Sequence, residues 1–232
     1  EIMNEKYEEW KQVRWNWYIN ELGIPEEKIS WKKHDKLAHY ASAAFDIQYD
    51  YSCLGGFSEV EGIHQRGNWD LSQHSKVSGV NLEYFDQKNN KKFIPHIMET
   101  SVGLTRLVLM VLDNAYTEED LGEGKSRVVL KIKPSLAPIK VAVFPLQRDD
   151  KLRQSAYNLY RSLKAKFTAE FDDSGNIGKM YRRQDEIGTP FCVTVDYQSL
   201  EDNMVTIRNR DTMAQERIKL NEVGNYISSK LS

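Results

Sequence analysis

The run IKVAVFPL, residues 139–146, constrains the fold of this chain more than any other feature. A nearly continuous apolar run is typical of a parallel strand that is covered on both faces, whereas a half-exposed strand alternates. An amphipathic helix pattern follows at about 150–167, and after it come the short strand TAEFD, the loop DDSGNIG, a basic helix and the strand FCVTVDY. Strand–helix alternation of this kind predicts right-handed crossovers.

The same region ends with a strand in MVTIRNR and a closing helix from about 213 to 230, which makes a compact unit of roughly 100 residues. The hydrophobic pattern of the sequence changes after Pro134, where the continuous apolar run begins, and a length of 232 residues suits two domains better than one. We therefore predict a boundary there, with domains at 1–134 and 135–232. The second is expected to be an α/β domain, a mixed sheet flanked by helices.

The first domain is predicted to be α+β, an antiparallel sheet with helices. Helices are expected at 5–22, at about 34–43 and from Gly103 onward, and a hairpin is expected between GVNLEYF and KKFIPHIM. The strand FDIQYDY alternates, with Phe45, Ile47, Tyr49 and Tyr51 on one face. In FSEVEGI the same alternation puts the carboxylates of Glu59 and Glu61 side by side on one face.

Composition excludes some classes of protein. No apolar stretch approaches the roughly 20 residues that cross a bilayer, so no membrane association is expected. Cys53 and Cys192 form no CxxC pair, which fits a reducing cytoplasm. None of the histidines has ligand spacing such as HxxxH, so no zinc is predicted; they are His34, His39, His64, His74 and His96. The net charge of −2 gives no support to nucleic-acid binding, and an excess of 15 Lys and Arg over 13 Asp and Glu after residue 134 supports it weakly.

Five runs in order resemble one family. They are EVEGIHQRGNWDL, METSVGLTR, LAPIKVAVFPL, DDSGNIGKMYRRQDEIGTPFCVTVDY and VTIRNRDTMAQERI, and together they extend over nearly the whole chain. They are similar to glycyl-tRNA synthetases of the class II, single-subunit type. The resemblance implies ATP-dependent activation of glycine to glycyl-adenylate, followed by transfer to the 3′ end of the glycine tRNA, tRNA(Gly).

The run METSVGLTR resembles motif 3 of class II enzymes, which closes the ATP site. The resemblance assigns ATP binding to Arg106, since a guanidinium pairs with phosphate oxygens and a helix N-terminus attracts anions. Mg2+ is expected to accompany ATP, held mainly by phosphates and by Glu99. On the residues alone, an arginine in a first helical turn is more often a solvated surface residue.

The resemblance also implies a glycine pocket that binds the substrate ammonium through Glu59, Glu99 and Ser101, with Glu61 nearby. Arg66 is implied to meet the substrate carboxylate or the α-phosphate, and with Arg106 it is assigned to catalysis. On the residues alone, two acids at i and i+2 on a strand are more often a solvent-exposed face, and Arg66 could simply be an ion-pair partner of Glu59 or Glu61.

The last hundred residues resemble the anticodon-binding domain of class IIa enzymes. Basic side chains in two places are candidates for contact with the anticodon loop: Lys179, Arg182 and Arg183 in one, Arg208 and Arg210 in the other. The alternative is that nearby acids pair with these arginines inside the fold; the acids are Asp185, Glu186, Asp202 and Asp211.

Motifs 1 and 2 of class II enzymes are not found in the chain, which therefore resembles the C-terminal portion of the family from after motif 2. The resemblance implies a homodimer for a full-length enzyme and predicts that this chain alone does not make glycyl-adenylate. A second hypothesis is a synthetase-like accessory protein that binds nucleic acid without ligase activity. The retained Glu59, Glu99, Ser101 and Arg106 favour the enzyme.

Overall fold

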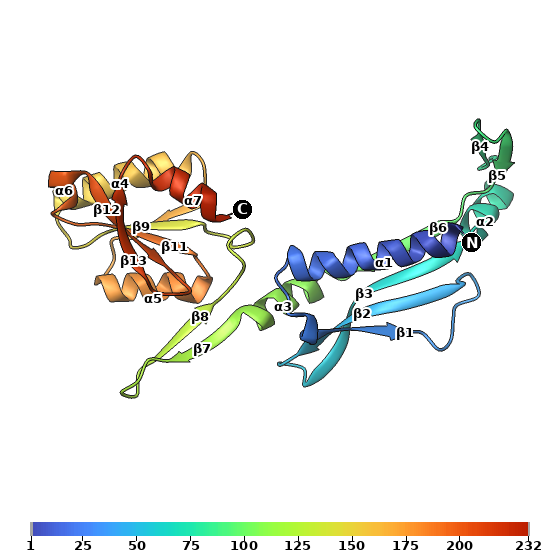
Figure 1. Ribbon diagram of the computed structural model, residues 1–232, viewed down its shortest axis with the longest axis horizontal. Helices are drawn as coiled ribbons and strands as arrows, with labels where there is room; N and C mark the ends of the chain where they lie inside the picture. The colour runs from blue at the N-terminus through green and yellow to red at the C-terminus, as the bar shows by residue number, and fades with distance from the viewer. Residues whose placement is uncertain (1, 232) are drawn as a thin grey trace. The chain divides into compact units, whose positions relative to one another are not determined.

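The computed structural model describes residues 2–231, which divide into two compact units, one ending at Asp113 and one beginning at Asn114. Each unit has its own sheet and its own core (Figure 1). Among the described residues, no helix is both long enough and apolar enough to cross a membrane.

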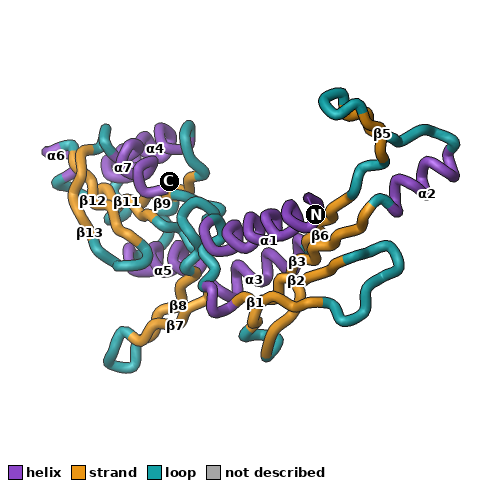
Figure 2. The backbone as a smooth tube through the Cα atoms, turned by 45° about the vertical axis from the view of Figure 1, so that its right-hand side comes forward, coloured by secondary structure: helices purple, strands orange, loops and turns teal. Residues whose placement is uncertain are grey.

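The first unit is built on an antiparallel sheet with strand order β1-β2-β3-β6. Its elements are α1 (Ile2–Asn20), η1 (Glu26–Lys28), β1 (Ile29–Lys33), β2 (Ala43–Tyr51), β3 (Gly56–Gly67), α2 (Trp69–Ser78), β4 (Tyr84–Asp86), β5 (Lys91–Phe93), β6 (Ile97–Val102) and α3 (Leu104–Ala115). The helix α1 runs along one face of this sheet (Figures 1 and 2). The predicted antiparallel sheet with helices is confirmed for this unit.

The apolar face predicted for FDIQYDY forms the core under α1. Ile47, Tyr49 and Tyr51 of β2 are almost fully buried and pack with Tyr7 and Tyr18 of α1. The Tyr7 hydroxyl donates a 2.6 Å hydrogen bond to the carbonyl of Ile63, which fixes the helix to β3. The opposite face of the sheet, called the free face below, carries the polar side chains of β2, among them Asp46 and Gln48.

A β-bulge in β3 overturns the predicted pairing of two carboxylates. Glu61 lies opposite Ile47, but Glu59 lies opposite Gln48, so one residue of β3 is left without a partner in the register. Directly paired residues of antiparallel strands share a face, and one extra residue reverses the alternation. Glu61 therefore faces α1, while Glu59 lies on the free face; the prediction that they stand side by side was wrong.

Two other local predictions for this unit need correction. No helix forms at 34–43, where the chain instead makes the loop from β1 to β2 and the His34 amide still pairs with the Ala44 carbonyl. The helix α2 was not predicted, and it ends at Gly79, whose φ of 72° suits the left-handed C-cap. The hairpin β4–β5 and the helix α3 were predicted and are present.

The second unit contains a mixed sheet with strand order β10-β9-β11-β12-β13. Its elements are β7 (Tyr116–Asp120), β8 (Ser126–Leu130), β9 (Val141–Pro145), α4 (Asp150–Lys164), β10 (Ala169–Phe171), α5 (Ile177–Ile187), β11 (Phe191–Val195), α6 (Ser199–Asp202), β12 (Met204–Asn209), β13 (Gln215–Lys219) and α7 (Val223–Leu231). Strands β9, β10 and β11 are parallel, and β12 and β13 are antiparallel.

Helices cover both faces of this sheet, as the apolar run predicted. All five residues of β9 are buried. Val141 and Val143 face the core shared with α4 and α7, while Ala142 and Phe144 pack with Met180 of α5 (Figure 1). The closing helix predicted at 213–230 is too long, because Gln215–Lys219 form β13, a hairpin partner of β12, and the helix α7 starts after it.

The division after Asp113 lies earlier in the chain than the predicted boundary at 134/135. The hairpin β7–β8 belongs to the second unit because Arg127 of β8 donates a 2.9 Å hydrogen bond to Asp185 of α5. The side chains of both residues are nearly inaccessible, at 3% and 2% exposure. The domain ranges 1–134 and 135–232 stay a prediction.

Candidate functional site

Three residues predicted for glycine binding lie on the same face of the first sheet, the free face. Register pairs His64 with Glu99 and Gly62 with Ser101, so Glu99 and Ser101 share the face that carries Glu59. Thr100 points the other way and accepts a 2.5 Å hydrogen bond from Trp10 of α1. Two carboxylates and a hydroxyl thus lie on one surface.

Glu61 lies apart from that surface, beneath α1. Its carboxylate accepts hydrogen bonds from Arg14 at 2.7 and 2.9 Å and from the Tyr18 hydroxyl at 2.8 Å, and its side chain is 0% exposed. Burial, followed by the nearby Glu61 charge, raises the pKa of the Tyr18 hydroxyl. In this structure Glu61 holds α1 on the sheet and is inaccessible to a substrate.

Arg66, at the end of β3, is fixed by two carboxylates. It donates to Asp70 of α2 at 2.6 and 2.9 Å and to Glu99 of β6 at 2.6 Å, and its guanidinium lies 4.1 Å from the ring centre of Tyr40. Hydrogen bonds from this guanidinium hold the pKa of Asp70 below its usual value. The ion-pair partners suggested from sequence, Glu59 and Glu61, are not the partners of Arg66 here.

Arg106 occupies the first turn of α3 with a side chain that is 55% exposed. One of its terminal nitrogens donates to the Glu59 carbonyl at 3.1 Å and lies 3.7 Å from the Glu59 carboxylate. The Tyr51 hydroxyl donates to the Arg106 carbonyl at 2.9 Å and anchors the turn. The guanidinium therefore stays accessible beside the free face.

Two arginines predicted to contact the anticodon are instead buried in the second unit. Arg208 donates to both oxygens of Asp185 at 2.9 and 3.1 Å, and Arg210 donates to the carbonyls of Gly188 and Ile132 at 2.7 Å each. Arg208 is 6% exposed and Arg210 is 1% exposed. Arg208 pairs with Asp185 and Arg210 pairs with Asp211, so both arginines are used inside the fold. This is the alternative that the sequence offered.

The other three basic candidates lie on or near the surface of α5. Lys179 and Arg182 are exposed. Arg183 is partly buried, and it holds the loop after β10 through hydrogen bonds to Asp172 at 2.9 Å and to the Ser174 carbonyl at 2.6 Å. Burial alone would raise the pKa of Asp172, but the hydrogen bonds from Ser174 and Arg183 outweigh it and lower that pKa.

Sequence patterns missed a second group of exposed residues, at the carboxyl ends of the parallel strands, where ligands bind in open α/β sheets. Arg148 follows β9, Tyr197 follows β11 and is 50% exposed, and Arg153 of α4 pairs with Asp173 of the loop after β10 at 2.5 Å. Arg148, Tyr197 and Asp173 could have been found from the sequence, because they lie at or just after the ends of strands that it predicts.

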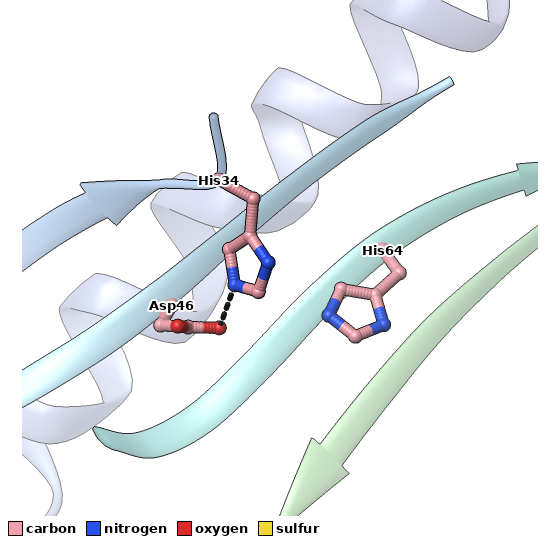
Figure 3. Close-up of side chains that lie close together, drawn as sticks. All are labelled: His34, Asp46 and His64. Atoms are coloured by element: carbon pink, nitrogen blue, oxygen red, sulfur yellow. Dashed lines mark ion pairs between the residues drawn. The ribbon is translucent and has the colours of Figure 1, made fainter. Parts of the chain in front are cut away.

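His34, Asp46 and His64 also lie close together on the free face of the first sheet (Figure 3). These are the described residues whose donor atoms are grouped closely enough to hold a metal ion. Spacing along the sequence gave no sign of this group, because its members come from three different segments.

Residues 140–230 match the family model of the anticodon binding domain. Over almost the whole chain the similar curated proteins are glycine–tRNA ligases. One from Chlorobaculum tepidum is 48% identical over 227 residues, 98% of this chain and 48% of that protein. One from Borrelia garinii subsp. bavariensis is 51% identical, covering 96% of this chain and 50% of that protein. One from Streptomyces coelicolor is 45% identical, covering 98% of this chain and 51% of that protein.

The chain thus spans about half the length of the curated relatives it matches. Identity near one half, sustained over nearly every residue of this chain, is far above what a shared fold alone requires. Together with the match to the anticodon binding domain at its C-terminal end, this similarity identifies the glycine–tRNA ligases as the family that the chain resembles over nearly its whole length.

Proposed function

We propose that this chain is part of an ATP-dependent ligase that activates glycine as glycyl-adenylate and transfers it to the 3′ end of tRNA(Gly). The observation that carries the proposal is the free face of the first sheet, which Glu59, Glu99 and Ser101 share in a chain that resembles this family. The first unit is then part of a class II catalytic domain, and the second is the anticodon-binding domain.

The charges on this face suit an amino acid with no side chain to recognise. Glu59 and Glu99 would accept hydrogen bonds from the glycine ammonium, and such charge-assisted bonds are about twice as strong as neutral ones. Arg66 holds Glu99 in place through its 2.6 Å hydrogen bond and keeps further N–H groups for the carboxylate or the α-phosphate. Selection against alanine would rest on steric exclusion of its methyl group.

Arg106 is proposed as the ATP contact. Its exposed guanidinium is tethered to the Glu59 carbonyl, next to the proposed ammonium site, so it could bring a phosphate or the adenine ring toward the glycine carboxylate. The Mg2+ that enters with ATP would be held mainly by the phosphates, with Glu99 as the protein ligand, and would offset their charge. By the family resemblance, the full-length enzyme is proposed to be a homodimer.

For tRNA(Gly), the second unit is proposed to bind the anticodon loop with its exposed cations. Lys179 and Arg182 of α5, with Arg183 behind them, would neutralise phosphates. The group at the carboxyl ends of the parallel strands adds Arg148, Arg153 and Tyr197, whose exposed ring could stack on an unpaired base. Arg208 and Arg210 are assigned a supporting role inside the domain.

The test is Glu99→Gln in the full-length protein that contains this chain. The KM for glycine should rise at least about tenfold, since one charge-assisted hydrogen bond is lost, while affinity for tRNA(Gly) stays unchanged. Glu83→Gln, at an exposed position of the same unit, serves as the matched control. Unchanged kinetics in the Glu99 variant would refute the pocket, and a wild-type protein without glycine-dependent ATP–pyrophosphate exchange would favour an accessory protein without ligase activity.

A further inference from the structure

Three side chains on the free face of the first sheet converge on one point. His34 follows β1, Asp46 lies on β2 and His64 lies on β3, and their donor atoms are all within 4.8 Å of one another (Figure 3). The backbone sets the arrangement, because the His34 amide bonds to Ala44, which is paired with His64, while Asp46 is paired with Gly62 on the same face. Asp46 lies 12 positions after His34 and 18 positions before His64, so the three residues meet through strand pairing and not through closeness in the sequence.

The Nε2 atom of His34 has no hydrogen-bond partner although it is buried. It lies 2.8 Å from Oδ1 of Asp46, close enough for attraction between charges, but the ring does not point its N–H at that oxygen. Two ligands of one tetrahedral ion, each about 2.0–2.1 Å from it, lie roughly 3.3 Å apart without bonding to each other. At 2.8 Å this ion pair is about 0.5 Å closer than two ligands of a common ion, and the His34 Nε2 has no hydrogen bond that an ion would have to displace.

His64 presents its two ring nitrogens to different neighbours. Its Nδ1 lies 3.5 Å from a carboxylate oxygen of Glu99, while its Nε2 lies on the side of Asp46. Metal-binding histidines usually have a carboxylate at the second ring nitrogen, where it fixes the ring and raises its basicity. Glu99 is positioned for that role.

Gly62 keeps the space between these ligands open. A Cβ atom at this position would lie 3.1 Å from Nε2 of His64 and 3.5 Å from Oδ1 of Asp46. Any side chain here would enter the space that an ion would fill. Gly62 has no unusual backbone angle that would by itself require glycine, so the space it leaves is its distinctive contribution.

We propose that His34, Asp46 and His64 bind a divalent transition-metal ion of the Zn2+ type. Two imidazoles and one carboxylate form a ligand set that zinc favours, with a fourth position left for water or another ligand. Mg2+ prefers oxygen ligands and octahedral geometry, so this site is distinct from the Mg2+ that accompanies ATP. This metal site does not depend on the proposed ligase activity, although Glu99 lies both beside the metal ligands and in the proposed glycine pocket.

The experiment is titration of the metal-free chain with ZnCl2 by calorimetry, repeated with Co2+, whose visible absorption reports ligand number. One ion should bind per chain, and bound Co2+ should show the strong visible absorption of a four-coordinate site. His34→Ala and His64→Ala should each weaken binding by more than about tenfold, and Glu99→Gln by about tenfold. His96→Ala removes an exposed histidine of the same unit and should change nothing.

Gly62→Ala gives a second variant that leaves all three ligands in the chain. It should weaken Zn2+ binding because its methyl group occupies the space between them. Tryptophan fluorescence shows whether each variant is folded, since all five tryptophans lie in the first unit. The proposal would be overturned if wild type bound no Zn2+, if the His34 and His64 variants bound Zn2+ as tightly as wild type, or if Mg2+ bound as strongly as Zn2+.

Discussion

Replacing Arg208 by alanine should unfold the second unit more easily without a specific effect on RNA recognition. Arg208 and Asp185 have side chains that are 7% and 2% exposed and share two hydrogen bonds. The guanidinium also lies 4.8 Å from the ring centre of Tyr181, whose hydroxyl bonds to Thr194 of β11. The substitution leaves the buried Asp185 carboxylate with Arg127 as its remaining cation.

Removing one partner of a buried ion pair costs about 3–5 kcal/mol, because the other charge stays buried without its compensation. Arg127 still donates to Asp185 at 2.9 Å, which favours the lower half of that range. With a urea m-value of about 2 kcal/mol/M, a loss of about 3–4 kcal/mol lowers the midpoint of unfolding by roughly 1.5–2 M. A surface substitution such as Lys179→Ala should shift it by no more than about 0.3 M.

The assay uses a property of this sequence that separates the two units. All five tryptophans lie before Asp113, so tryptophan fluorescence follows the first unit while far-ultraviolet circular dichroism follows both. In Arg208→Ala the fluorescence transition should stay in place and part of the dichroism transition should move to lower urea. An unchanged dichroism midpoint together with weaker RNA binding would refute the structural role and restore Arg208 as an RNA contact.

Three further predictions concern other groups of the chain. Arg14→Met should destabilise the first unit by about 3–5 kcal/mol, while adding Glu61→Leu should recover most of the loss in urea unfolding; a double variant as unstable as the single one would contradict this. Burial would raise the pKa of Asp113, but hydrogen bonds from the Ser52 and Cys53 amides, the Cys53 thiol and the Tyr49 hydroxyl lower it below 3.8. The stability that the Asp113 carboxylate adds to the fold is therefore present above pH 3.8 and is lost as pH falls through the lowered pKa. Asp113→Asn should flatten the acid dependence of the fluorescence midpoint below about pH 5, and an identical acid limb would count against it. A thiol reagent should titrate Cys53 in the folded chain and reach Cys192 only in denaturant, since Cys192 is buried and its burial raises the thiol pKa; two reactive thiols in the folded chain would contradict the buried position.

Much of the second unit was predictable because its strands are buried on both faces. Apolar continuity in β9 and β11 marked them without reference to any partner. The strand β13 was missed because QERIK has no apolar stripe and becomes a strand through pairing with β12. Tertiary pairing decided its structure, and local preference did not.

The candidate site was predictable in its residue types more than in its geometry. Sequence alternation cannot reveal a bulge, so it put Glu61 beside Glu59 when the fold buries Glu61 under α1. The sequence offered Asp185 as a possible partner of Arg208, but did not show that Arg127 shares the same buried carboxylate, which depends on elements far apart in the chain. Distances along the sequence also hid the convergence of the two histidines with Asp46.

The most direct test of the account is binding of the tRNA(Gly) anticodon stem-loop to this chain, measured as a function of salt for wild type and for Arg182→Ala with Lys179→Ala. Each lost phosphate contact should reduce the slope of log K against log salt by about 0.7–0.9, with the urea midpoint unchanged. Wild type should also prefer this stem-loop over one with another anticodon. Equal affinity for both RNAs, or full affinity and slope in the double variant, would contradict an anticodon site on the exposed face of α5.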